Sequence, residues 1–404
     1  MKRISAIVFL LLGLSLRAGT GGAASPQMPY FEARKQQNTY LGPGREAPEP
    51  EGLTEVAIGF FGPADLRHPE GGDLWLAANL AVEEANAEGG YRRLPFRLIP
   101  CWADNPWGNG VTHLTRMAYE HGIWAIIGGI DGPSTHLAEQ LVAKARLALV
   151  SPASTDKTVN LANVPWMFSA LPGDRHLAPL LGKALLEECA GREFVLVAAN
   201  DHDSHQFLAE LEKFIARERA RPSYRFEFPS GASDYPDLIR RVVAAQPHTV
   251  VLIAGARDSA ALLDGLRRTG FEGKVFGGPA MGRRSVLRRA AAWRGAVVFP
   301  QPVYPSPGAE GFAQVFADRS GYPPDYAAAC AYESTRMLMA AIREAGLNRA
   351  RICDALRRLS PWNGKAVRIE WDALGENRSP VTLGTIADGR LVPFTPPVVP
   401  SPAR

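Results

Sequence analysis

One polar loop, residues 130–135, holds the side chains best suited to binding an anion. It follows an apolar run and opens a helical pattern. Small residues such as Gly132 let backbone N–H groups approach a ligand, and a helix start favours negative charge. The hydroxyls of Ser134 and Thr135 add donors, and Asp131 stands just before them. The loop therefore predicts either a carboxylate site or an ordinary capping turn.

A second polar loop, residues 200–205, follows a later apolar run and contains two aspartates and two histidines. Such a cluster invites a metal interpretation. However, its spacing matches no standard zinc set, and hydrogen bonding and capping account for a polar loop at a strand end. We therefore predict no metal site and expect Asp203 or His202 to contact a ligand instead.

Three further side chains are candidates for ligand contact, each with a structural alternative. Arg257, which follows the apolar run 250–253, could clamp a carboxylate with two hydrogen bonds or lie exposed at the surface. Trp102 and Trp107 flank a short loop and could stack on a flat ligand or pack against neighbouring helices. We expect one of the two tryptophans to contact the ligand.

Common catalytic motifs are absent from the sequence. It contains no Gly-x-Ser-x-Gly, no His-Glu-x-x-His, no Gly-x-x-x-x-Gly-Lys and no Cys/His pair at a recognisable spacing. We therefore predict no catalytic residue and no cofactor, and we keep an exported enzyme only as the lowest-ranked alternative.

The hydropathy pattern predicts the elements that must position these loops. Apolar runs cover residues 56–61, 96–99, 124–127 and 147–150, and then 194–197, 250–253, 275–276 and 297–299. Their alternation with helical patterns predicts an α/β fold with parallel sheets and right-handed crossovers. Because the 380 residues that follow residues 1–24 (404 minus 24) exceed what one hydrophobic core usually holds, we expect two lobes. Ligands of such sheets sit beyond the carboxyl ends of the strands, where the polar loops lie.

The N-terminal region has the pattern of an export signal followed by a tether. Residues 1–24 contain Lys2 and Arg3, an apolar core and small residues at the end, which predicts a cleavable signal peptide. Residues 25–53 are rich in Pro, Gly and charge and predict a flexible leader. No cysteine lies near the cleavage region, so we expect a soluble protein without a lipid anchor.

Charge and cysteine content bear on the remaining classes. Removing the signal takes away three basic residues and no acids, so the formal net charge falls from +4 to +1, which argues against a nucleic-acid partner. The four cysteines, Cys101, Cys189, Cys330 and Cys353, show neither a disulfide framework nor a metal pattern. We interpret each as a small buried residue.

The chain resembles the branched-chain amino acid binding protein family, the type I periplasmic solute receptors of ABC transporters. The resemblance covers roughly residues 54–395 and is carried, in order, by VAIGFFGPAD, LAANLAVEEANAEGG, ADNPWG, AIIGGIDGPST, ALVSPASTDKT and PPDYAAACAYESTRMLMAAI. It implies two Rossmann-like lobes joined by three crossovers, with ligand bound between them. Lobe 1 is then expected to comprise residues 54–173 and 303–378, and lobe 2 residues 174–302 and 379–398.

The resemblance also implies a binding mode and a partner. The carbonyl of Ala153 and the hydroxyl of Thr155, or of Ser154 instead, would accept hydrogen bonds from a substrate ammonium. The expected protein is a periplasmic monomer that delivers an amino acid or related small carboxylate to an ABC permease in the inner membrane. No acid stands at 280–282, where the family often has one, which leaves carboxylate, amide and aromatic ligands open. A sensory module that signals to a membrane partner is the main alternative.

Overall fold

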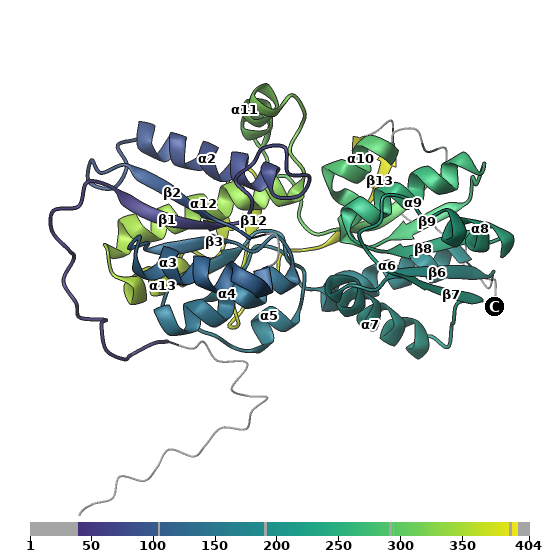
Figure 1. The fold of residues 1–404 in the computed structure, drawn as a ribbon, viewed down its shortest axis with the longest axis horizontal. Coiled ribbons are helices and arrows are strands. Elements are labelled where there is room, and N and C mark those ends of the chain that lie inside the picture. The colour runs from purple at the N-terminus through teal and green to yellow at the C-terminus, as the bar shows by residue number, and fades with distance from the viewer. Residues whose placement is uncertain are drawn as a thin grey trace, which may run out of the picture.

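The protein consists of two α/β lobes that lie side by side (Figure 1). The computed structural model describes residues 39–103, 106–189, 192–290, 293, 295–387 and 390–394. The predicted signal peptide and the first part of the predicted leader lie outside these residues. Among the helices that are described, none is long and apolar enough to cross a membrane.

Lobe 1 contains a five-stranded parallel sheet in the order β2-β1-β3-β4-β5. The strands are β1 (Val56–Phe61), β2 (Phe96–Cys101), β3 (Ala125–Gly128), β4 (Ala148–Ser151) and β5 (Met167–Ser169). Every residue of β1, β3 and β4 is buried, as expected for continuous apolar runs in a sheet covered on both faces.

The helices of lobe 1 come from two separate stretches of the chain. The first provides α2 (Gly72–Ala87), the π-helical turn η1 (Pro106–Gly110), α3 (Val111–Tyr119), α4 (Gly132–Ala145) and α5 (Thr158–Leu161). The second provides α11 (Glu310–Ser320), α12 (Tyr326–Ala345) and α13 (Arg349–Arg358), followed by a small hairpin of β11 (Trp362–Asn363) and β12 (Arg368–Ile369). Helix α12 packs against α2, so both stretches share one hydrophobic core.

Lobe 2 contains a seven-stranded sheet in the order β14-β13-β10-β9-β8-β6-β7. Its strands are β6 (Phe194–Ala199), β7 (Tyr224–Phe228), β8 (Thr249–Ile253), β9 (Lys274–Gly277), β10 (Val297–Gln301), β13 (Thr382–Ala387) and β14 (Arg390–Pro393). Its helices are α6 (Asp174–Cys189), α7 (His202–Arg217), α8 (Pro236–Ala244), α9 (Ala256–Arg268), the 3₁₀ turn η2 (Pro279–Gly282) and α10 (Arg284–Ala290).

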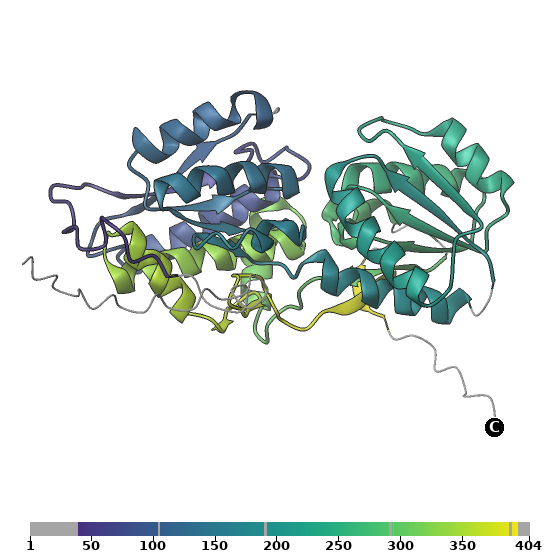
Figure 2. The same cartoon turned by 90° about the horizontal axis from the view of Figure 1, so that it is seen from below.

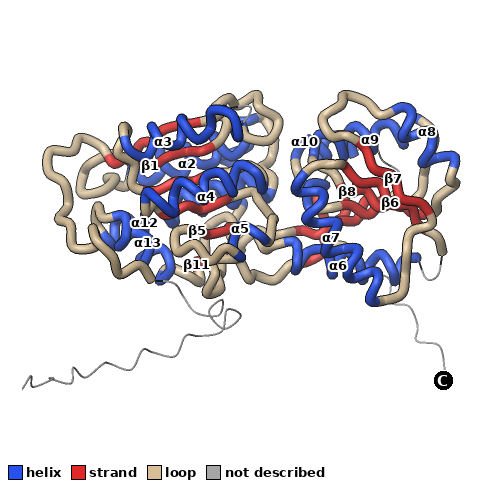
Figure 3. The backbone as a smooth tube through the Cα atoms, turned by 60° about the horizontal axis from the view of Figure 1, so that its bottom comes forward, coloured by secondary structure: helices blue, strands red, loops and turns tan. Residues whose placement is uncertain are grey.

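Strand β6 shows why helices cover both faces of the lobe 2 sheet (Figure 3). Val195 and Val197 belong to one hydrophobic core, whereas Phe194 and Leu196 belong to another. Successive side chains of a strand point to opposite faces, so each face needs its own layer of helices. Strands β6 to β10 pair in parallel, as predicted, and two antiparallel strands extend the sheet at one edge. Strands β13 and β14 are antiparallel because only two residues connect them, and a parallel pair needs a much longer crossover.

The chain passes between the lobes after β5, after β10 and before β13, which Figure 2 shows as neighbouring connections. Residues 39–53, the second part of the expected leader, lie against lobe 1. The Tyr40 ring packs on Trp166 with 5.2 Å between ring centroids, and the Asn348 amide donates to three carbonyls of this segment. All four cysteines are buried and free, in agreement with their interpretation as buried residues.

Candidate functional site

A cavity of about 110 Å³ lies between the lobes, next to the carboxyl ends of β3 and β4 in lobe 1 and of β6 and β8 in lobe 2. This is the place where ligands bind to open parallel sheets. The polar and charged side chains that line it are Glu70, Asp131, Thr155, Asp203, Ser204, Arg283 and Tyr326. A single water needs about 10–15 Å³ of such volume, so the cavity has room for several water-sized groups and suits a small solute.

The hydroxyls predicted to bind an anion at the start of α4 are used inside lobe 1. Asp131 is the N-cap, and its Oδ1 accepts from the backbone N–H of Ser134 at 2.8 Å and from the Ser134 hydroxyl. The Thr135 hydroxyl donates to the Asp131 carbonyl at 2.7 Å and lies 3.0 Å from the Ser151 hydroxyl. Ser134 and Thr135 are fully buried and do not line the cavity. Their roles at this helix start are therefore capping and packing.

The start of α4 is occupied by a carboxyl group of lobe 2. The Gly132 N–H donates to both carboxylate oxygens of Asp203, each at 3.1 Å. A Cβ atom at position 132 would lie 2.2 Å from Asp203 Oδ1, so only glycine permits this approach. The Gly132 N–H at the start of α4 therefore faces a carboxyl group of the same chain, contributed by lobe 2.

Asp203 is the most electrostatically perturbed residue of the cleft. Burial, and then the nearby charge of Asp131, raise the pKa of Asp203 to about 8, although the Gly132 N–H opposes the shift. A carboxyl with this pKa is mostly protonated at neutral pH. Asp203 is therefore poised to give up its proton when a cation enters the cavity.

The loop after β4 presents Ala153 and Thr155 to the cavity. Ser154 does not line the cavity. Its hydroxyl accepts a hydrogen bond from the Asp156 N–H at 3.2 Å, which helps to fix the conformation of the loop. The Thr155 carbonyl accepts from the backbone N–H of Asp174, the first residue of α6. Burial raises the pKa of Asp174 well above its ordinary value, with the Thr155 hydroxyl opposing the shift.

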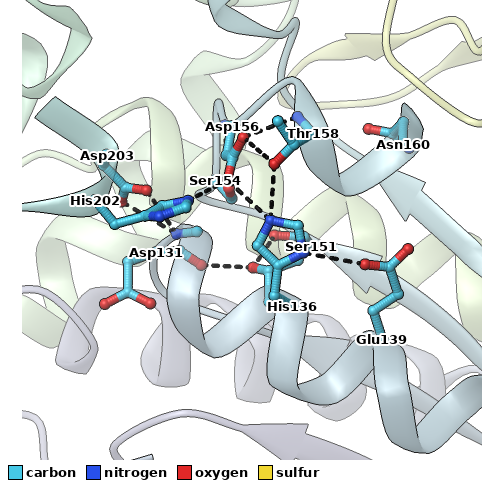
Figure 4. A network of polar contacts seen from close by, with 12 residues as sticks. Asp131, His136, Glu139, Ser151, Ser154, Asp156, Thr158, Asn160, His202 and Asp203 are labelled. Carbon is cyan, nitrogen blue, oxygen red and sulfur yellow. Dashed lines mark hydrogen bonds and ion pairs between the residues drawn. The ribbon is translucent and has the colours of Figure 1, made fainter. Parts of the chain in front are cut away.

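A network of two histidines and two acids joins the lobes beside the cavity (Figure 4). His202 Nε2, at the start of α7, lies 2.6 Å from Asp156 Oδ2, and His136 Nε2, on α4, lies 3.0 Å from the same oxygen. The hydrogen bond to Asp156, followed by that to Glu139, raises the pKa of His136 to about 9. Burial alone would raise the pKa of Asp156, but hydrogen bonds from His136, His202 and Thr158 hold it below its ordinary value.

A buried arginine, Arg283, also lines the cavity. Arg283 Nε donates to Asp325 Oδ2 at 2.8 Å, and its Nη2 donates to the Glu70 carbonyl at 2.8 Å. The Arg283 side chain is 8% exposed, and the Asp325 side chain 1%. Asp325 caps α12 in lobe 1, so this ion pair also crosses between the lobes.

Comparison with known proteins defines the family. Residues 60–390 match the family model described as periplasmic binding protein. The chain belongs to this family. No curated protein matches the chain. The family match confirms the predicted resemblance. The solved structures described next confirm the predicted fold class.

Three solved structures share the fold of this periplasmic binding protein. LivJ from Streptococcus pneumoniae, a branched-chain amino acid transporter substrate-binding protein in complex with isoleucine, is 19% identical, with 83% of this chain and 97% of that chain covered and a TM-score of 0.74. The leucine-binding protein LivK from Thermotoga maritima is 17% identical, with 84% and 98% covered and a TM-score of 0.75. A solute-binding protein from R. palustris in complex with benzoate is 12% identical, with 84% and 95% covered and a TM-score of 0.71.

Two further candidates, Arg257 and Trp102, are not part of the cavity lining. Arg257 is exposed on α9. Trp102 is partly buried and packs on Phe61, with 5.4 Å between ring centroids, while the side chain of Trp107 is outside the described part of the structure. Arg283 was not among the predicted residues, although it stands directly after the 280–282 segment, where the family often has an acid. The interlobe partners His136 and Asp156 were not predicted either, because local spacing does not connect them.

Proposed function

We propose that this chain is the extracytoplasmic solute-binding protein of an ABC uptake system and that it holds an amino acid or a similar small zwitterion between its lobes. The observation that carries the proposal is the buried carboxyl of Asp203, which lines the cavity close to the charge of Asp131. A ligand ammonium placed there would replace the proton on Asp203 and relieve the repulsion between the two acids.

The cavity lining offers partners for both charged groups of a zwitterion. Thr155 from lobe 1 and Asp203 from lobe 2 offer acceptors to an ammonium. Arg283 lines the same cavity, whereas its partner Asp325 does not, so the guanidinium is the group that faces a ligand carboxylate. LivJ in complex with isoleucine and the R. palustris protein in complex with benzoate both hold a carboxylate-bearing ligand. In our proposal Arg283, and not the start of α4, binds that carboxylate here.

Closure of the lobes is the proposed transport signal. A ligand that contacts both lobes stabilises the closed state by its differential affinity, and a permease in the inner membrane then recognises the closed form. We propose a monomer that acts in the periplasm after loss of residues 1–24 and that catalyses no reaction. The intact mass of the exported protein tests the loss of residues 1–24, because retention of the signal would contradict export. Recovery of a co-purified ligand in chemically unchanged form tests the proposal that the protein catalyses no reaction.

Calorimetric titration tests the ligand assignment. The purified protein, freed of bound metabolites by unfolding and refolding, is titrated with amino acids, with the matching acids that lack the amine, and with the matching amines that lack the carboxylate. Because closure itself changes in Asp203→Asn, the test is the difference between two ligands: the variant should lose about 1–3 kcal/mol of binding for the amino acid relative to the acid that lacks the amine. The exposed Asp237→Asn is the matched control. Equal losses for both compounds would reject Asp203 as the ammonium partner.

A further inference from the structure

We propose that His136, Asp156 and His202 form a binding site for a divalent transition metal, with Zn²⁺ as the preferred ion, that fastens the two lobes together. The inference does not rest on the proposed solute, since none of the three residues lines the cavity. It also revises the sequence prediction: the histidine of the 200–205 loop finds its metal-binding partners in the other lobe and not within its own loop.

The three ligand atoms are gathered at one point. His136 Nε2, Asp156 Oδ2 and His202 Nε2 all lie within 4.8 Å of one another. In a tetrahedral zinc site, bond lengths of about 2.1 Å place neighbouring ligand atoms about 3.4 Å apart. The two His-to-Asp distances, 2.6 and 3.0 Å, need to lengthen only slightly to admit the ion. The two imidazole nitrogens must also adjust to about 3.4 Å, from a separation of at most 4.8 Å.

Neighbouring side chains orient the ligands in the way that metal sites require. Glu139 Oε2 lies 3.2 Å from His136 Nδ1 and directs the opposite ring nitrogen toward the site. Asp156 Oδ1 accepts from the Thr158 N–H at 2.8 Å and from the Thr158 hydroxyl at 2.7 Å, which leaves Oδ2 for the ion. A carboxylate behind a histidine and a fixed carboxylate ligand are typical of protein metal sites.

Ligand type and access favour zinc over calcium or magnesium. Two imidazoles and one carboxylate suit Zn²⁺, Cu²⁺ or Ni²⁺, whereas the hard cations take mainly oxygen ligands. The side chains of His202 and His136 are 38% and 24% exposed, and that of Asp156 is fully buried. An ion can therefore enter from solvent, and the fourth position of the tetrahedron remains available to water or to the Thr158 hydroxyl.

The site links the lobes, because His202 belongs to α7 of lobe 2 while His136 and Asp156 belong to lobe 1. Separation of the lobes removes one of three ligands, so the ion binds the closed state more tightly than the open state. By reciprocity, bound metal increases the affinity for any solute that also selects the closed state.

Zinc titration of the refolded, solute-free protein tests the proposal. The expected result is saturable one-to-one binding of Zn²⁺ near neutral pH, weakened by about tenfold or more in His202→Gln and in His136→Gln. His205→Gln, an exposed histidine on the same helix as His202, and His121→Gln, an exposed histidine in lobe 1, are matched controls that should bind as the wild type does. Thermal unfolding without metal confirms that each variant is folded.

Two further readouts separate a metal site from a hydrogen-bonded latch. Co²⁺ bound at the site should give the visible absorption bands of a tetrahedral ion, and Zn²⁺ should decrease the radius of gyration in wild type but not in His202→Gln. The proposal is overturned if the wild type shows no saturable zinc binding, if the control variants lose as much affinity as His202→Gln, or if zinc binds without changing the radius of gyration. In the first case the three residues form a latch held by protons alone.

Discussion

Replacing Asp203 by asparagine is expected to hold the ligand-free lobes together at neutral pH. In the closed arrangement the carboxyl is buried against Gly132 and faces the charge of Asp131, so its pKa rises from 3.8 to about 8. When the lobes separate, water reaches the carboxyl and the pKa returns toward its ordinary value. Closure at neutral pH therefore requires this carboxyl to take up a proton.

The sign and the size of the effect follow from the two pKa values. Between about pH 4 and about pH 8 the closed state binds one more proton than the open state. The free energy of lobe closure is therefore most favourable below about pH 4 and becomes less favourable as the pH rises to about 8. Near pH 7 the difference amounts to about three pKa units, or about 4 kcal/mol. Asparagine keeps an oxygen that accepts from Gly132 and has no proton to lose, so the variant escapes this cost.

Interlobe energy transfer measures the prediction. Dyes are attached through Glu120→Cys in lobe 1 and Arg221→Cys in lobe 2, both at exposed positions, and the efficiency is recorded as the pH rises. The wild type should open across the window, whereas Asp203→Asn should stay closed. The exposed Asp237→Asn should follow the wild type. Superimposable profiles for wild type and Asp203→Asn, or wider opening in the variant, would refute the electrostatic reasoning.

Three other substitutions test separate contacts. Asp325→Asn leaves the buried guanidinium of Arg283 without its charged partner and should lower the free energy of unfolding by about 3–5 kcal/mol in a denaturant titration; an unchanged midpoint would contradict a buried ion pair. Gly132→Ala places a methyl group against Asp203 and should weaken solute binding by about 1–3 kcal/mol in calorimetry, with no change in thermal stability if the contact forms only on closure. Asn348→Ala removes the donor that holds the 39–53 segment and should speed its cleavage by protease, and equal cleavage rates would show that the donor is dispensable.

The strands and the position of the cleft could be predicted because they depend on local information. A strand buried on both faces, such as β1, must be a continuous apolar run, and the polar loops that follow such strands must gather at one edge of a parallel sheet. The loops that carry Asp131, Thr155 and Asp203 were found in this way and do line the cavity.

The pairings across the cleft could not be predicted because they depend on how two lobes face each other. Gly132 and Asp203 are 71 residues apart, and no periodicity in either loop connects them. The same holds for His136 and His202, which share a carboxylate only when the lobes meet. Local pattern left the hydroxyls of residues 134 and 135 open between a ligand contact and a capping turn, and a capping box with Asp131 uses the first of them.

The packing of α12 on α2 imposes an order on the folding of the chain. The Tyr332 hydroxyl on α12 donates to Glu84 on α2 at 2.6 Å, and the two residues are 248 positions apart in the sequence. Strands β6 to β10 all come between the two helices along the chain. Contacts of such long range form late, because a large loop must close first. Most of lobe 2 can therefore fold while the apolar face of α2 is still exposed, before α12 packs on it. The nascent chain is most prone to aggregation during that interval. Pulsed hydrogen exchange should show β6 and β8 protected before α2, and simultaneous protection would contradict this order.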